Sequence, residues 1–202
     1  MKDSFFTINK PSRGLYKDKG SKFISLAFPV TSEDEINELL YTLKKEYHDA
    51  RHHCFAWKLG PTGEKYRIND DGEPSGTGGK PVLGQINAKQ LTNILVVVIR
   101  YFGGILLGTG GLIKAYREAA ADALRHAVIS EQYVRDTYRV SCNYQNLKLI
   151  SKIIEEYKGE QSDRDFSEKC SLTVSLRQSY SQKFVDSINR LGETEIKIKK
   201  LN

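Results

Sequence analysis

Two glycine-rich stretches constrain the fold of this chain more than any other feature of its sequence. The first runs from Asp70 to Gly79 and the second from Arg100 to Gly111, and each leads directly into a segment with helical periodicity. Glycine permits backbone conformations and close approaches that side chains forbid. The first amides of a helix have no partner within the helix and lie at the positive end of its dipole. The sequence therefore predicts two loops that lead into helix N-termini suited to an anion.

The composition predicts one large or two small compact domains. The chain has 202 residues, of which 39% are hydrophobic, a formal net charge of +6 and a pI near 9.1. This moderately basic balance favours acidic partners such as RNA or phosphorylated ligands. The three cysteines are widely spaced, which argues against a disulfide framework or a closed zinc site. No stretch has the length and apolarity of a secretion signal or a bilayer span, so we expect a soluble cytoplasmic protein.

Hydrophobic periodicity predicts an α+β fold with two domains. The elements expected in the first are a strand at 22–30, a helix that follows a capping box at 31–35 and ends near 47, a strand at 51–59, a short helix with Pro81 in its first turn, a strand at 94–102 and a helix at 111–127. The β-branched run that starts at Ile94 is typical of a central strand buried on both faces. We expect Thr109 to cap the last helix, whose alanines allow close packing on a sheet.

From about residue 129 the pattern changes to βαββαβ, the order of the ferredoxin-like motif. The expected elements are strands at 133–142, 160–166, 169–177 and 193–199, with helices at 145–157 and 181–191. We therefore expect an N-terminal domain of residues 1–130 and a C-terminal domain of residues 131–202. Alternation along the strands predicts an apolar face that meets the helices and an open polar face. The open face collects Arg135, Thr137, Arg139, Ser171, Thr173, Ser175, Arg177, Lys197 and Lys199.

The glycine-rich loops are the leading candidate for an anion site. Arg51, Arg100 and Lys114 would supply positive charge. The backbone donors would come from both loops, at Gly76, Thr77, Gly78, Gly108, Thr109, Gly110 and Gly111. The sequence has neither a Walker motif nor a complete GxGxxG pattern. The alternative is that the glycines only permit tight turns and contact between helix and sheet.

Two smaller groups of residues are also candidates for metal binding or catalysis. Asp70, Asp71 and Glu73 could hold Mg²⁺ or act as acid and base groups. More often such a sequence forms a turn in which Asp side chains accept backbone hydrogen bonds. His52 and Cys54 share one face of a strand and could form a nucleophilic dyad or two metal ligands. A packed or hydrogen-bonded pair is the more common arrangement.

Residues 50–56, 70–77, 100–104 and 107–112, with Ala115 and Tyr116, closely resemble the IMPACT family, in particular its bacterial, YigZ-like branch. The resemblance implies that the N-terminal domain is similar to the second domain of ribosomal protein S5 and to domain IV of elongation factor G. It implies a ferredoxin-like C-terminal domain similar to the last domain of that factor. Eukaryotic members regulate translation during amino-acid starvation by competing for an activator of an eIF2-alpha kinase. They do so with additional N-terminal sequence, and we do not expect that mechanism here.

We therefore expect a non-catalytic protein without a cofactor that associates with RNA or the ribosome and modulates translation. Its loops would bind phosphate groups, and cations of the C-terminal domain would extend the contact: Arg135, Arg139, Arg177, Lys197 and Lys199. A solvated sheet face is the alternative for this second surface. Two other functions remain open. One is an enzyme that acts on a phosphorylated small molecule through the acids of the first loop, and the other is a protein-interaction module with purely structural loops.

Overall fold

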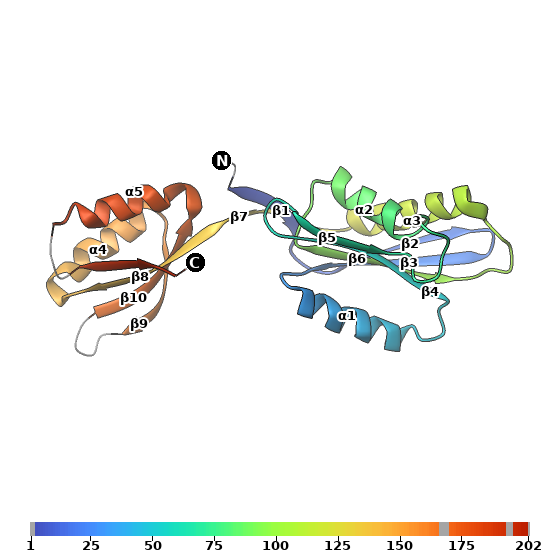
Figure 1. The fold of residues 1–202 in the computed structure, drawn as a ribbon, viewed down its shortest axis with the longest axis horizontal. Coiled ribbons are helices and arrows are strands. Elements are labelled where there is room, and N and C mark those ends of the chain that lie inside the picture. Colours follow the sequence, from blue (N-terminus) through green and yellow to red (C-terminus); the bar gives the residue numbers. More distant parts are fainter. Residues whose placement is uncertain (1–2, 166–169, 193–195, 202) are drawn as a thin grey trace. The chain divides into compact units, whose positions relative to one another are not determined.

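The computed structural model describes residues 3–165, 170–192 and 196–201. Within them the chain divides into two units. The N-terminal unit spans residues 5–132, and the C-terminal unit combines the chain from Tyr133 onward with the residues up to Ser4. Each unit contains both helices and strands, as the hydrophobic periodicity predicted (Figure 1). None of the described helices has the length and apolarity needed to cross a membrane.

A five-stranded antiparallel sheet is the framework of the N-terminal unit. Its strands lie in the order β2 (Ser12–Asp18), β3 (Ser21–Pro29), β6 (Ile94–Tyr101), β4 (His52–Leu59) and β5 (Lys65–Asn69). All residues from Ile94 to Arg100 are buried in the middle of this sheet. The predicted central strand is therefore confirmed, because a β-branched run can be buried on both of its faces.

Helices cover both faces of this sheet (Figure 1). On one face lies α1 (Glu33–Glu46), and on the other lie α2 (Gly79–Ala88) and α3 (Gly108–Arg125). The predicted start of α1 is confirmed, since the Ser32 hydroxyl accepts a hydrogen bond from the Glu35 amide. The predicted cap at Thr109 is wrong. Helix α3 begins one residue earlier, at a glycine with a φ of +69°, so the threonine lies inside the first turn and no side chain caps the helix.

The C-terminal unit has the predicted βαββαβ order. Its elements are β8 (Arg135–Cys142), α4 (Tyr144–Glu156), β9 (Glu160–Asp165), β10 (Cys170–Arg177), α5 (Gln178–Asn189) and β11 (Lys197–Lys200). The antiparallel sheet has the order β11-β8-β10-β9, and both helices pack on one face of it (Figure 1). Parts of three predicted strands fall on residues 166–169 and 193–195, outside the described residues. The likeness of the two units to ribosomal protein S5 and elongation factor G remains a prediction.

Four of the described strands were not predicted from the sequence. Strands β1 (Ser4–Ile8) and β7 (Ile129–Tyr133) pair as a two-stranded sheet, and β2 and β5 form the two edges of the five-stranded sheet. Both edge strands are rich in polar residues, and residues 65–68 of β5 are exposed. Edge strands of this kind lack the alternation of apolar side chains that marks a strand in a sequence.

Candidate functional site

The two glycine-rich loops meet at a cavity of about 430 Å³ in the N-terminal unit. The first loop, the ends of β4 and β6, and the second loop with the start of α3 each form part of its wall. The lining residues are Arg51, His52, Gly72, Glu73, Pro74, Arg100, Phe102, Leu106, Leu107, Gly108, Thr109 and Leu112. The second loop is fixed at its beginning, because the Gly103 amide donates a hydrogen bond to the Ser21 hydroxyl at 3.1 Å.

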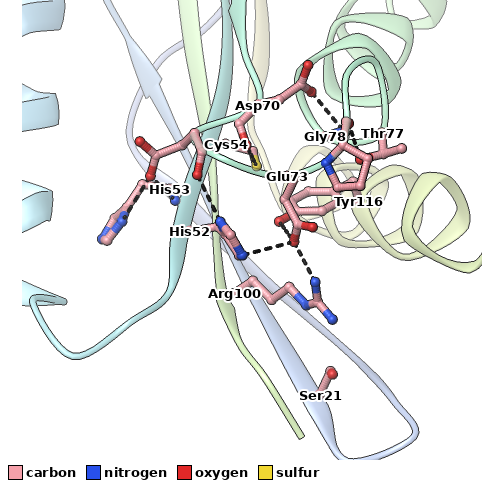
Figure 2. A network of polar contacts seen from close by, with 12 residues as sticks. Ser21, His52, His53, Cys54, Asp70, Glu73, Thr77, Gly78, Arg100 and Tyr116 are labelled. Atoms are coloured by element: carbon pink, nitrogen blue, oxygen red, sulfur yellow. Dashed lines mark hydrogen bonds and ion pairs between the residues drawn. The ribbon is translucent and has the colours of Figure 1, made fainter. Parts of the chain in front are cut away.

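A buried acid holds the inner wall of this cavity together (Figure 2). Oε1 of Glu73 accepts hydrogen bonds from Nη1 of Arg100 at 2.6 Å and from the Tyr116 hydroxyl at 2.9 Å. Nε2 of His52 lies 3.8 Å from the same oxygen. The Glu73 and Arg100 side chains are only 3% and 6% exposed. This network ties the first loop to β6, α3 and β4, and it compensates much of the positive charge that Arg100 was expected to offer a ligand.

The amides of the first loop already have an anionic partner. Oδ1 of Asp70 accepts hydrogen bonds from the Gly78 amide at 2.9 Å and the Gly79 amide at 2.8 Å, and Oδ2 accepts one from the Gly76 amide at 2.8 Å. The Thr77 amide donates to the Pro74 carbonyl within the turn. The prediction that Gly76, Thr77 and Gly78 offer donors to a ligand is therefore wrong, because a carboxylate of the protein occupies the positive end of α2.

The third acid of the first loop, Asp71, is also engaged. Oδ2 of Asp71 accepts a hydrogen bond from the His53 amide at 2.7 Å, and the Asp71 carbonyl lies 2.8 Å from Nδ1 of His52. Since a carbonyl only accepts, Nδ1 of His52 carries a proton and Nε2 is directed towards Glu73. Residues 3–165, 170–192 and 196–201 contain no group of three His, Cys, Asp or Glu side chains arranged to hold a metal. The alternative of a turn stabilised by Asp side chains is confirmed.

Cys54 is a packed residue rather than a reactive thiol. Its side chain is fully buried, and Sγ donates a hydrogen bond to the Asp70 carbonyl at 3.0 Å. Burial raises the pKa of this thiol to about 12, so it is protonated at neutral pH. His52 and Cys54 thus each contact a different carbonyl of the first loop, and the interpretation as a nucleophilic dyad is wrong.

The second loop leads into a helix start that no side chain caps, unlike the first loop, where Asp70 accepts hydrogen bonds from the amides at the start of α2. Leu107, Gly108 and Thr109, which open α3, line the cavity, and no side chain caps this helix. Arg51 is exposed on the same wall. The buried Nε of Arg100 has no hydrogen-bond partner among the described residues. Lys114 is exposed on α3 but lies outside the cavity lining.

The open face of the C-terminal sheet is less basic than predicted. Arg135 pairs with Glu160 at 2.6 Å, and Arg177 contacts both carboxylate oxygens of Asp3, at 2.6 and 2.8 Å. The Arg177 guanidinium lowers the pKa of the Asp3 carboxyl well below its usual range. These two arginines therefore add less net positive charge to the face than the sequence predicted, because each is paired with a carboxylate.

Three cations of that face have no carboxylate partner in the described part of the chain. Arg139 donates to the Ser171 and Thr173 hydroxyls and to the Asp163 carbonyl, all neutral acceptors. Lys197 and Lys199 are exposed on β11 and form no ion pair with another described residue. Arg139 on β8 and the two lysines on β11 thus form a positively charged strip, which we call the positive strip.

Comparison with known proteins gives consistent matches along the chain. The model of the Impact N-terminal domain matches residues 19–124. The IMPACT family member YigZ of Escherichia coli is 36% identical over 160 residues, 78% of each chain. The IMPACT family member YvyE of Bacillus subtilis is 31% identical over 199 residues, 98% of this chain and 92% of the other. A crystal structure of a hypothetical protein has a TM-score of 0.74 and 30% identity, and the match covers 100% of this chain and 99% of that one.

Proposed function

Because this chain belongs to the IMPACT family, we propose that it acts in translation by binding RNA or the ribosome through phosphate groups. The start of α3 is the main contact, and the positive strip of the C-terminal unit is the second. The resemblance implies a role in translational control for the eukaryotic members of this family. The proposal keeps that general role and replaces their protein competition with a direct contact to nucleic acid.

The uncapped start of α3 is the observation that carries this proposal. Helix α3 has 18 residues, long enough for a full dipole, and the residues at its start, Gly108 and Thr109, line the cavity. The exposed Arg51 and the side chain of Arg100 lie on the same wall. A phosphate oxygen would satisfy both the helix amides and these guanidinium groups.

The cations on β8 and β11 support a contact that is independent of RNA sequence. Arg139, Lys197 and Lys199 stand among hydroxyl groups on an open sheet face. Cations and hydroxyls are the groups that contact phosphates and sugars, whereas they carry little base readout on their own. We therefore expect affinity that depends strongly on salt and weakly on base sequence.

We expect Arg51→Ala to weaken RNA binding and to reduce its dependence on salt. Each phosphate contact that a cation makes to a single strand contributes about 0.7 to the slope of log affinity against log salt concentration. Removing one contact should lower the slope by roughly that amount. The measurement is fluorescence anisotropy of a labelled single-stranded RNA with the full chain over a series of KCl concentrations.

The matched control is Arg67→Ala. Arg67 is an exposed arginine on the edge strand β5 and does not line the cavity. Its removal should leave the slope unchanged. An affinity that does not respond to salt, or equal effects of the two substitutions, would contradict the proposal.

A further inference from the structure

We propose that the cavity binds a single nucleotide by its terminal phosphate, with the phosphate at the start of α3 and the base against Phe102. The inference rests on the proposed function and deepens it, because it names the part of an RNA that the site recognises. The same chemistry is offered by the phosphorylated end of a single-stranded RNA and by a free nucleoside monophosphate.

The lining of the cavity has two chemically different parts. Arg51, His52, Glu73 and Arg100 form a charged and polar part with the start of α3. The other part is apolar and consists of Pro74, Phe102, Leu106, Leu107 and Leu112. A volume of about 430 Å³ falls within the range of small-ligand sites. A ligand that suits this lining is of nucleotide size and carries an anionic group at one end and a flat apolar group at the other.

The charge on the cavity wall suits a phosphate monoester. Arg51 and Arg100 contribute two positive charges and Glu73 contributes one negative charge, so one positive charge remains beside the positive end of α3. Arg100 uses Nη1 for its ion pair with Glu73, and its side chain also lines the cavity. Its guanidinium group therefore adds charge to the wall beside Arg51.

A terminal phosphate fits this site better than an internal one. A monoester carries between about 1.5 and 2 negative charges at neutral pH and has three free oxygens. An internal phosphodiester carries one charge, and both of its neighbouring nucleotides would need space. The cavity has a volume suited to one nucleotide, and its lining includes the start of α3, Arg51 and Arg100.

Phe102 has the surroundings of a stacking platform. It lies on the apolar part of the cavity wall, and 40% of it is exposed. The guanidinium groups of Arg51 and Arg100 lie 5.9 and 5.6 Å from the centre of its ring. Leu106, on the same loop, is 82% exposed. Bases stack on exposed aromatic side chains of this kind, with arginines nearby, in proteins that bind single strands.

The test compares RNA ends on the full chain. The probes are one short oligouridylate with a 5′-phosphate, the same RNA with a 3′-phosphate, the same RNA with hydroxyls at both ends, a circular form of it, and uridine monophosphate. We expect at least one phosphorylated linear RNA to bind about tenfold more tightly than the hydroxyl-ended and circular forms. Uridine monophosphate should compete for the same site.

Variants of Phe102 test the role of the ring. Phe102→Ala should lower the preference for a phosphorylated end roughly fivefold or more, since one stacked base is lost. Phe102→Trp should retain the preference. Tyr66→Ala, which removes an exposed aromatic on β5, should not change it. Because the ring of Phe102 is partly exposed, these variants are expected to fold, and the fluorescence of the buried Trp57 verifies this.

The outcomes separate this inference from the proposed function. Equal, salt-dependent binding of the circular and phosphorylated RNAs would overturn end recognition and leave RNA binding in place. A preference that is as large in Phe102→Ala as in the unmodified chain would also overturn it. If no RNA binds but uridine monophosphate binds and requires Phe102, the proposed function fails and the cavity is assigned to a free nucleotide. If neither binds, both fail.

Discussion

Glu73→Ala should lower the free energy of unfolding of the N-terminal unit by about 3 kcal/mol, near the lower end of the range for breaking a buried ion pair. Glu73 accepts hydrogen bonds from Arg100 and Tyr116, and both of those side chains are buried. Without the carboxylate, Arg100 remains a buried cation with no counter-charge, and the Tyr116 hydroxyl loses its acceptor. The unpaired groups cost more than the pair itself contributes, because the desolvation of Arg100 is no longer compensated.

Urea unfolding monitored by tryptophan fluorescence measures the stability of the N-terminal unit. The chain has one tryptophan, Trp57, and it is buried in β4 of the N-terminal unit. Glu118→Ala is the matched control, since Glu118 pairs with Arg117 on the exposed side of α3 and its removal should change stability by less than about 0.5 kcal/mol. The loss of stability in Glu73→Gln should lie between those of Glu73→Ala and Glu118→Ala, because glutamine keeps an acceptor oxygen and loses the charge. Equal stability of the Glu73 and Glu118 alanine variants would contradict the role of the network.

Asp70→Ala should destabilise the N-terminal unit by about 2 kcal/mol, comparable with the loss of a strong helix cap. The carboxylate accepts three backbone hydrogen bonds, from Gly76, Gly78 and Gly79, and lies at the start of α2. Helix α2 has no other side-chain cap, since its N-cap residue is Gly78. The substitution leaves all three amides without their acceptor and removes a favourable charge from the helix dipole.

Asp70→Asn separates the two parts of this interaction. The asparagine oxygen can still accept from Gly78 and Gly79, whereas its NH₂ group cannot accept from Gly76. Amide hydrogen exchange should therefore become faster at Gly76 in both variants and at Gly78 and Gly79 mainly in the alanine variant. Asp34→Asn, in the first turn of α1, is the control and should cost less than about 0.5 kcal/mol. Unchanged exchange at Gly76 in both Asp70 variants would disprove the cap.

Much of the fold could be predicted from local patterns. The β-branched run of β6, the serine before α1 and the alternation along β8 and β10 each depend on residues that are close in sequence. Local patterns failed where the neighbouring side chains are polar, as in β5. They also failed at the start of α3, because the conformation of Gly108 sets that helix end one residue before Thr109.

The candidate site could be predicted only in outline. Two loops were expected to meet, and they do line one cavity. The amides of the first loop were misassigned because Asp70 reaches across six to nine residues to contact them, and a linear pattern does not distinguish an internal carboxylate from an external phosphate. Asp3 and Arg177 are 174 residues apart, so no local pattern could pair them.

One signal for the buried network was present in the sequence. Arg100 directly follows a run of residues expected to be buried on both faces of the sheet. A charged side chain in that position needs a buried partner of opposite charge. Glu73 is such a partner, but its identification required the fold to bring together residues 27 positions apart.

The most direct test of a phosphate contact at the start of α3 is an NMR titration of ¹⁵N-labelled full chain with single-stranded RNA. If RNA phosphate contacts this helix end, the amide resonances of Thr109, Gly110 and Gly111 shift as RNA is added. Those of Gly76, Gly78 and Gly79 should remain in place, because Asp70 already accepts their hydrogen bonds. Shifts in the first loop without shifts at the start of α3 would contradict a phosphate contact at that helix end.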